Sequence, residues 1–254
     1  MTEKFVNVPT KDGLMKTYIV HPDAAGPHPA VVLFMDIWGV REELQSIARR
    51  IAAKGYYAVL PNLYYRQGDI ANVFRNDEGR MISLHKLDKK LETIVHEQRR
   101  NLSNSMIMSD IVDLIPFIDK QRVAKDGPMG SIGWCMGGWI GLKAAVEFPE
   151  KFQATATLHA TKPISDQKDS PHLQFNKMRG GLYSGWAEGD HLSPPSMVLE
   201  LEALLASSPV DYLGKMHMGT EHGYALPDRD IYAEKAAEQD WPSIFDLYQR
   251  YLSN

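Results

Sequence analysis

Short apolar runs alternate along this chain with longer segments whose apolar residues recur at helical spacing. The run "PAVVLFMD" at 29–36 is continuously apolar, as expected for a strand buried on both faces of a sheet. It precedes "REELQSIARRIAAKGY" at 41–56, in which Leu44, Ile47 and Ile51 share one helical stripe. Because strand-like and helix-like segments keep alternating towards the C-terminus, the sequence predicts an α/β fold on a mostly parallel sheet.

The opening segments "KFVNVPT" and "LMKTYIVHP" are typical of two strands, and "KDG" between them signals a hairpin. Further strands are expected at 56–61, 127–134, 151–159, 180–187 and 210–218, and helices at 80–100, 101–121, 137–150, 196–208 and 228–254. No linker, charge block or internal repeat divides the 254 residues. We therefore expect a single domain over 1–254, in which the less regular segment 66–100 is a possible insertion or lid.

The composition is that of a globular protein, with 44% hydrophobic and 24% charged residues. A net charge of −4 lacks the basic footprint expected for nucleic acid or an anionic membrane surface. The single cysteine excludes an intrachain disulfide framework and favours a reducing compartment. No apolar h-region opens the chain, and no apolar run nears the roughly 18 residues of a spanning helix. The expected location is the cytoplasm.

The only cysteine lies in "SIGWCMGGWIG" at 131–141, between a strand pattern and a helix pattern. Gly133, Cys135 and Gly137 match the nucleophile elbow G-x-S-x-G with Cys in place of Ser. At such a turn the helix N-terminus favours a thiolate, and the N–H of Met136 is a natural oxyanion donor. The alternative is a buried, inert cysteine beside a glycine-rich turn.

A thiol nucleophile needs a base, and the base needs an orienting acid. Elbows of this type are followed along the chain by the acid and then the histidine. Asp190 stands where a strand gives way to a loop, and His222 follows the last predicted strand. The sequence thus favours Cys135, Asp190 and His222 as a catalytic triad. Four other histidines follow Cys135 and are interpreted as pocket-lining, packed or surface residues: His159, His172, His191 and His217.

The stretches "GWCMGG", "GDHLSPP" and "EHGYA" resemble the nucleophile, acid and histidine motifs of the dienelactone hydrolase family, whose members are cysteine-using α/β-hydrolases. "PNLYYRQGD" and "DIWGV" resemble further stretches of the family, so the likeness runs from about residue 15 to the C-terminal helix. The resemblance implies a mostly parallel central sheet with helices on both faces and a short N-terminal antiparallel hairpin. It also implies hydrolysis of carboxylic esters or lactones through a thioester.

The resemblance implies further site residues. Ile37 falls where the fold supplies a second oxyanion N–H, and Asp36 where the family has a glutamate that interacts with the resting thiol. Leu226 stands where members acting on dienelactone have an arginine, four residues after the histidine, so one cationic anchor is missing. Arg80 lies near where another of the family's arginines falls, and Arg229 is a candidate replacement for the missing one; the alternative for both is a solvated surface position. Dienelactone itself is therefore a doubtful substrate.

Aromatic residues near these motifs are candidates for a substrate pocket, with core packing as the alternative: Trp38, Tyr64, Trp134, Trp186 and Tyr224. No metal or organic cofactor is expected, since the sequence lacks H-E-x-x-H, paired cysteines and a P-loop. The expected partner is a small ester, lactone or thioester. Competing interpretations are a thioesterase or general carboxylesterase on the same triad, and a non-hydrolytic ligand-binding or thiol redox-sensing relative. A sensor needs a thiolate but has no use for a complete triad.

Overall fold

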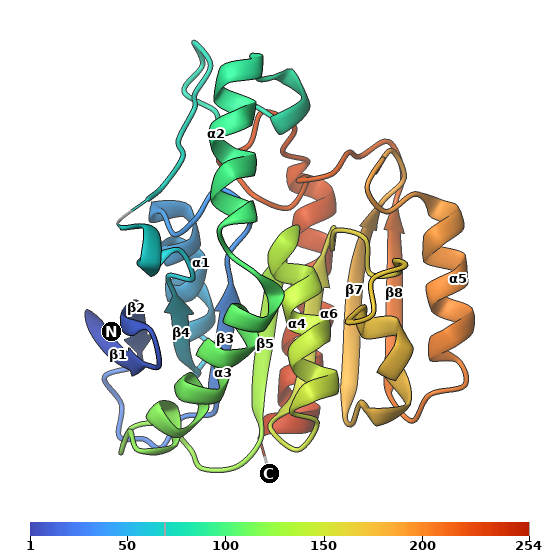
Figure 1. Cartoon of the computed structure of the whole chain (residues 1–254). Coiled ribbons are helices and arrows are strands. Elements are labelled where there is room, and N and C mark those ends of the chain that lie inside the picture. The colour runs from blue at the N-terminus through green and yellow to red at the C-terminus, as the bar shows by residue number, and fades with distance from the viewer. Residues whose placement is uncertain (69, 254) are drawn as a thin grey trace. The chain divides into compact units, whose positions relative to one another are not determined.

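The computed structural model describes residues 1–68 and 70–253. Contacts within the chain divide it into two compact units. The first unit comprises Met1–Gly127 with Asp228–Asp230, and the second comprises Pro128–Pro227 with Ile231–Asn254. Figure 1 colours the chain from blue at the N-terminus to red at the C-terminus. The single domain over 1–254 stays a prediction.

The first unit contains four strands in the order β1-β2-β4-β3. They are β1 (Thr2–Thr10), β2 (Gly13–His21), β3 (Ala30–Phe34) and β4 (Tyr57–Pro61). β2 is antiparallel to both β1 and β4, whereas β3 and β4 are parallel. The predicted N-terminal hairpin is confirmed, and its turn lies at the "KDG" signal. All residues of β3 and β4 are buried, which explains their uninterrupted apolar sequences.

The helices of the first unit differ in how they begin, and a side-chain cap fixes the start of α2. α1 (Glu42–Ala52) contacts β2 and β4 through its buried apolar stripe. The helix expected over 80–100 begins only at α2 (Lys89–Arg100), because the Asp88 side chain caps it by accepting the N–H groups of Lys90 and Leu91. The preceding residues instead form a short 3₁₀ turn, η2 (Leu84–Lys86), after bridge pairing by Met81. The expected boundary was therefore wrong by about two turns of helix.

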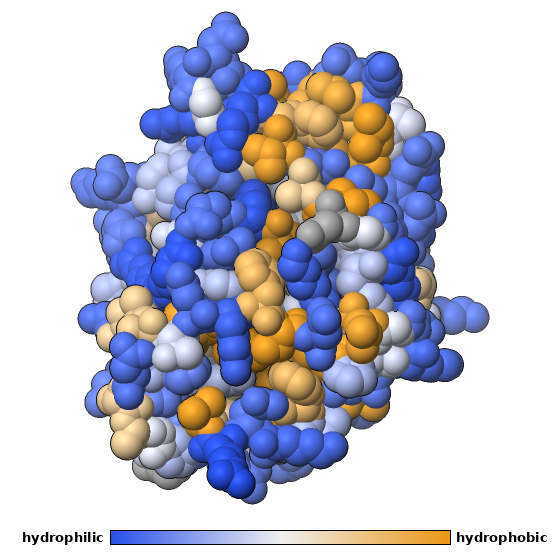
Figure 2. All heavy atoms as spheres, turned by 90° about the vertical axis from the view of Figure 1, so that its left-hand side faces the viewer, coloured by the Kyte–Doolittle hydropathy of each residue, from blue (hydrophilic) through white to orange (hydrophobic). Residues whose placement is uncertain are grey.

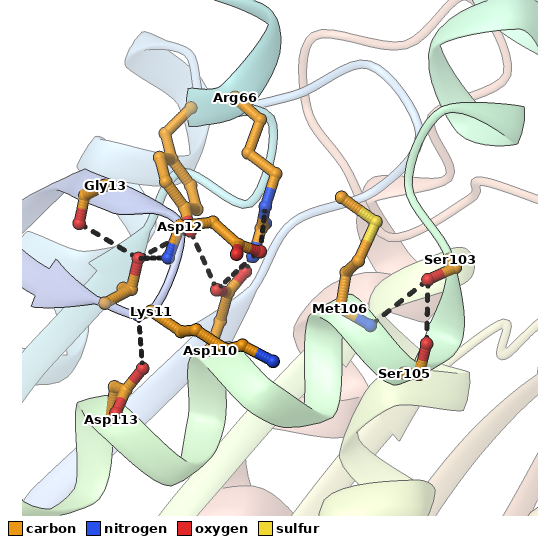
Figure 3. Close-up of polar contacts among 11 residues, drawn as sticks. Lys11, Asp12, Gly13, Arg66, Ser103, Ser105, Met106, Asp110 and Asp113 are labelled. Carbon is orange, nitrogen blue, oxygen red and sulfur yellow. Dashed lines mark hydrogen bonds and ion pairs between the residues drawn. The ribbon is translucent and has the colours of Figure 1, made fainter.

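Helix α3 (Asn104–Asp119) is tied to the hairpin by a group of polar contacts (Figure 3). Arg66, in the 3₁₀ turn η1 (Tyr65–Gln67), forms ion pairs with Asp12 in the hairpin turn and with Asp110 on α3. The backbone N–H of Lys11 donates to Asp113, one turn further along α3, at 2.9 Å. Segments more than 40 residues apart in sequence are thus held together by charge-assisted bonds, which no local pattern indicates.

The second unit contains four parallel strands in the order β5-β6-β7-β8. They are β5 (Met129–Trp134), β6 (Phe152–Leu158), β7 (Gly181–Ala187) and β8 (Asp211–His217). The helical elements are α4 (Met136–Glu147), η3 (Pro171–Lys177), α5 (Pro195–Leu205) and α6 (Glu234–Leu252). Figure 1 shows α4 in front of these strands and α6 behind them, and both helices contact β5 and β6. The predicted α/β class is confirmed.

No helix within 1–68 and 70–253 is long and apolar enough to span a membrane. On the face drawn in Figure 2, hydrophobic side chains form separate groups between hydrophilic ones. The buried apolar surface lies instead on the strands and on the inner faces of the helices, where most strand residues have almost no exposed area. The strands therefore form the rigid part of each unit, and the loops at their ends are free to carry polar chemistry.

Candidate active site

Cys135 occupies the turn between β5 and α4 with φ 56° and ψ −119°. A positive φ is strained for a residue that carries a Cβ atom, and it persists only where neighbouring contacts impose it. Here the Cys135 N–H donates to Leu158 O at 3.2 Å, and its carbonyl accepts N–H groups from Gly138 at 3.1 Å and Thr161 at 3.0 Å. This is the backbone geometry expected of a nucleophile elbow.

The glycines around Cys135 are required by the close approach of neighbouring backbone. A Cβ atom on Gly133 would lie 2.0 Å from the carbonyl oxygen of Gly137. This clash could be relieved only by moving the backbone. A Cβ atom on Gly138 would lie 2.7 Å from the Cβ of Ala160 in the loop after β6. The glycine pattern in the sequence thus follows from packing the first turn of α4 against the adjacent strands.

The start of α4 provides electrostatic support beside the thiol. Met136 is the first residue of the helix, so its N–H has no acceptor within the helix. Such N-terminal amides carry partial positive charge and stabilise anions close to them. Cys135 is mostly buried, at 8% exposure, which strengthens the field that it feels. The site therefore favours a thiolate and an adjacent oxyanion.

Asp190 and His222 are in direct contact. Asp190 follows β7 and His222 follows β8, and the distance from His222 Nδ1 to Asp190 Oδ2 is 2.7 Å. The other oxygen, Asp190 Oδ1, accepts the N–H groups of Leu192 at 2.8 Å and Ser193 at 3.1 Å. The carboxylate is thereby held by its own loop while it orients the imidazole, which is the arrangement a general base requires.

The environment of His222 raises its pKa to about 10. Burial alone would lower the pKa, because it disfavours the charged ring. Cys135 and Asp190 outweigh that cost, Cys135 mainly through its charge and Asp190 through its charge and its hydrogen bond to Nδ1. At neutral pH the ring is therefore protonated, and Cys135 and Asp190 are the groups that favour its charge.

Two residues beside the candidate triad make contacts that the sequence does not indicate. Thr161, in the loop after β6, donates its hydroxyl to Cys135 Sγ at 3.3 Å. The His159 ring lies edge-on to His222, with ring centres 5.0 Å apart, and packs at 5.6 Å against Tyr224. Threonine in a strand-end loop has no distinguishing sequence signal. His159 was considered only as a pocket-lining residue, and its place beside His222 is compatible with that.

The other histidines are held by different groups. His217, the last residue of β8, contacts Asp240 of α6 through Nε2 at 2.6 Å and is buried. The His172 ring nitrogen Nδ1 contacts the Ser170 hydroxyl at 2.7 Å. The His191 ring lies edge-on to that of His222, the candidate base, with ring centres 6.4 Å apart. Each of these assignments agrees with the structural interpretation given to the residue from the sequence, except that His191 also touches the site.

In the first unit, Asp36 forms a buried ion pair. Arg41 donates from Nη1 to Asp36 Oδ1 at 2.7 Å and from Nη2 to Oδ2 at 3.1 Å. The N–H of Trp38 also donates to Oδ1, at 3.2 Å. Arg41 holds a second carboxylate, Asp228, through Nε at 2.6 Å. Both oxygens of Asp36 are thus engaged by a permanent cation, while its predicted contact with the thiol stays a prediction.

With this geometry in place, comparison with known proteins assigns the chain to a family. The profile of the Dienelactone hydrolase family matches residues 15–252. The chain belongs to the dienelactone hydrolase family. The resemblance noted in the sequence is confirmed, and the protein is a hydrolase acting on lactones or esters.

Relatives cover almost the full length of the chain. A protein of Synechocystis sp., provisionally named a carboxymethylenebutenolidase, is 26% identical over 251 residues, covering 97% of this chain and 96% of its own. A likewise provisionally named Methylorubrum extorquens protein is 25% identical over 258 residues, covering 97% and 80%. A Klebsiella pneumoniae structure, provisionally a dienelactone hydrolase, superposes with TM-score 0.83 at 20% identity, covering 98% of this chain and 99% of that one. The structure of a dienelactone hydrolase-like promiscuous phosphotriesterase superposes with TM-score 0.75 at 17% identity, covering 98% of each chain. These structures show the α/β-hydrolase fold.

In the first unit, the residues predicted for the pocket differ in exposure. The Tyr64 hydroxyl donates to Ile37 O at 2.9 Å, so both are fixed by one bond. Trp38 is buried, and the guanidinium of Arg229 lies over its ring at 5.4 Å. Arg229 is itself 3% exposed, so the solvated position considered for it is wrong. Arg80 is exposed. Their pocket roles stay predictions.

In the second unit, the pocket candidates are all buried. The Trp186 indole N–H donates to the Tyr212 hydroxyl at 3.1 Å, and the Tyr224 hydroxyl donates to an Asp240 oxygen at 2.6 Å. Trp134 has no exposed area. Leu226, which stands at the family's arginine position, is buried too. Within 1–68 and 70–253, no group of three or more His, Cys, Asp or Glu side chains is placed to bind a metal.

Proposed function

We propose that this family member hydrolyses carboxylic esters or lactones with Cys135 as nucleophile, His222 as acid and base, and Asp190 as the orienting acid. The observation that carries the proposal is the position of His222. Its ring binds Asp190 at 2.7 Å, and the charge of Cys135 contributes to raising its pKa to about 10. A thiolate–imidazolium pair of this kind is an activated nucleophile together with the proton that its leaving group needs.

In the acylation half-reaction the thiolate attacks the carbonyl carbon, and a C–S bond forms as the carbonyl oxygen becomes an oxyanion. The N–H of Met136 donates to that oxyanion, and one such donor stabilises the transition state by roughly 3 kcal/mol. The tetrahedral adduct collapses by breaking the C–O bond to the alcohol oxygen, which takes the proton of His222. In a lactone this step opens the ring, so alcohol and acyl group stay in one molecule.

In the deacylation half-reaction the charge on His222 changes. Acylation removes the negative charge of sulfur, which is one of the causes that raise the pKa of His222. The neutral ring that results accepts a proton from water as the water oxygen attacks the thioester carbon. Collapse then breaks the C–S bond, releasing a carboxylic acid and restoring the thiolate beside the imidazolium. Asp190 keeps the ring oriented in both half-reactions.

Several finer assignments rest on the family resemblance. Ile37 as the second oxyanion donor and Asp36 as a carboxylate acting on the thiol remain predictions. Leu226 in place of an arginine favours a substrate that lacks the carboxylate of dienelactone. The proposed substrate class is therefore a small, uncharged ester or lactone. The complete Asp190–His222 pair supports hydrolysis over redox sensing, and the cytoplasmic location is still proposed from the single cysteine.

The test compares the wild type with Cys135→Ala on p-nitrophenyl acetate and on dienelactone. We expect turnover of the acetate that disappears in the variant, with slower turnover of dienelactone. Rapid quenching followed by mass spectrometry should recover the acetyl group on the peptide that contains Cys135. A variant that keeps the wild-type rate would exclude the cysteine mechanism, and turnover without an acylated peptide would argue against an accumulating thioester.

A further inference from the structure

We propose that Thr161 is a further catalytic residue, whose hydroxyl donates a hydrogen bond to the Cys135 sulfur and stabilises the thiolate during turnover. The inference rests on the proposed function of Cys135 and deepens it. Thr161 was not identified from the sequence, and it follows β6 in the loop that also contains His159. All of the contacts involved lie within the second unit.

Thr161 is attached to the elbow at two points. Its hydroxyl oxygen lies 3.3 Å from Cys135 Sγ, within the longer range that applies to bonds to sulfur. Its backbone N–H donates to Cys135 O at 3.0 Å. The second contact fixes the distance between the two main chains, and the branched Thr side chain has few rotamers. The hydroxyl is therefore held beside the sulfur before substrate binds, which is the condition for useful electrostatic stabilisation.

The backbone on both sides of Thr161 is strained. His159 has φ 41° and Lys162 has φ 44°, and neither is a glycine. Left-handed conformations of this type are unfavourable for residues with side chains, so they survive only where the surroundings impose them. Two in four residues, next to the candidate nucleophile, indicate that the loop has been shaped to hold one particular geometry.

Ser193 supplies part of that constraint and links the loop to the candidate acid. Its hydroxyl donates to Ala160 O at 2.6 Å and accepts the N–H of Lys162 at 3.0 Å, so it binds the residues immediately before and after Thr161. The N–H of Ser193 donates to Asp190 Oδ1 at 3.1 Å. One short chain of bonds thus connects the carboxylate, the loop and the sulfur.

The chemistry of sulfur decides what this bond does. A thiolate is a charged acceptor and binds a hydroxyl donor more strongly than a neutral thiol or thioester does. The Thr161 bond therefore stabilises the resting thiolate, and it stabilises sulfur again when the thiolate departs in deacylation. It complements the imidazolium of His222, which must give up its proton during acylation, because a hydroxyl keeps its proton throughout.

The test compares Thr161→Val, which keeps the shape but removes the donor, with Thr161→Ser, which keeps the donor. Iodoacetamide alkylation reports the thiolate alone, since Cys135 is the only cysteine in the chain. We expect the pH midpoint of alkylation to rise by about one unit in Thr161→Val, the shift expected for losing a hydrogen bond to a charged group. Thr161→Ser should stay near the wild type. An unmoved midpoint in Thr161→Val would overturn the inference.

Two further measurements separate this inference from the proposed function and from misfolding. If Thr161→Val does not fold, as judged by circular dichroism, Thr161→Ala takes its place with the same expectation. At pH values below the alkylation midpoint, we also expect kcat/KM of Thr161→Val to be about tenfold lower than that of the wild type. A tenfold change is equivalent to one pKa unit. If the alkylation midpoint shifts while Cys135→Ala keeps its esterase activity, the proposed function fails and the Thr161 bond stands. If Cys135→Ala is inactive but the midpoint does not shift, only the role of Thr161 fails.

Discussion

The second unit contains two buried aspartate–histidine pairs of nearly the same length. His222 Nδ1 lies 2.7 Å from Asp190, and His217 Nε2 lies 2.6 Å from Asp240. Both carboxylates are almost completely buried. By distance and burial alone, either pair has the form expected of the acid and base of a hydrolase.

The two pairs differ in the third group that each contacts. Asp240 also accepts the hydroxyls of Tyr183 and Tyr224, each at 2.6 Å, so three side chains converge on one carboxylate. Asp190 instead accepts N–H groups from its own loop, and its histidine faces a thiol. The hydrogen bonds of Asp240 all lie within a buried network. The Asp190–His222 pair instead places a charged imidazole beside a thiol, where it can take part in a reaction. We therefore expect such a pair to be catalytic only where its histidine faces a reacting group.

Replacing each histidine should distinguish the two pairs most clearly. We expect His222→Ala to lose turnover of p-nitrophenyl acetate by on the order of 10⁶-fold, as in other triads that act as a unit. Cys135→Ala should match it. His217→Ala should keep kcat within several-fold for the fraction that folds, because it touches no reacting group. Steady-state kinetics normalised to folded protein by circular dichroism makes the measurement. Equal losses of kcat in both histidine variants would contradict the assignment of one pair to catalysis and the other to structure.

Replacing the candidate acid should have the next largest effect. Asp190→Asn is expected to lower kcat by on the order of 10⁴-fold, because an amide favours the wrong tautomer of the imidazole. It also removes one cause of the raised pKa of His222, about 10 in the wild type. The imidazolium, present below that pKa, should then lose its proton at lower pH. An NMR titration of the His222 ring checks this, and Asp240→Asn is the matched control that should leave the ring unchanged.

For Asp240 the loss should be in stability. Asp240→Asn removes the charged acceptor on which three side chains converge, and leaving a buried donor without its acceptor costs roughly 1–3 kcal/mol. We expect urea unfolding, followed by tryptophan fluorescence, to shift to lower denaturant by a corresponding amount. The kcat of the folded variant should remain near the wild type. A large loss of kcat with unchanged stability would show that Asp240 acts in catalysis and not in stabilising the fold.

The sequence predicted one of these pairs and missed the other, for a physical reason. Cys135, Asp190 and His222 each follow a strand, so the parallel order of the strands brings their ends to one edge of the sheet. Asp240, on a helix, instead contacts His217, 23 positions before it, and Tyr183, 57 positions before it. The contacts of Thr161 and Ser193 depend on the geometry of their loops, which no residue pattern predicts. Contacts of this kind depend on packing that is settled only in the fold.

The carboxylate of the first unit allows the comparison to be extended. Asp36 pairs with Arg41, which stays protonated at every accessible pH, so the pair lacks the titratable partner of a proton-transfer group. Asp36→Asn should lower the free energy of unfolding by roughly 3 kcal/mol, since Arg41 would lose one of its two buried carboxylates. Thermal unfolding measures this. Alkylation of Cys135 in the same variant tests the role that the family resemblance gives Asp36, and an unmoved pH midpoint would remove that role.

Tyr224→Phe should have the smallest effect and refines the contrast within the second unit. The substitution removes one of the three donors to Asp240 while keeping the ring that packs against His159. Two donors remain, so we expect a loss of about 2 kcal/mol in stability, the usual contribution of one hydrogen bond to a charged group. The pKa of Tyr224 lies well above its ordinary value, first because burial disfavours the phenolate and then because Asp240 repels it, so the hydroxyl stays protonated and donating across the whole active pH range. Urea unfolding measures the stability, and the KM for p-nitrophenyl acetate measures the pocket. A raised KM with unchanged stability would support the pocket role considered for Tyr224 from the sequence. Unchanged KM with reduced stability would place its hydroxyl in the structural network, and only its ring would then contact His159 beside His222.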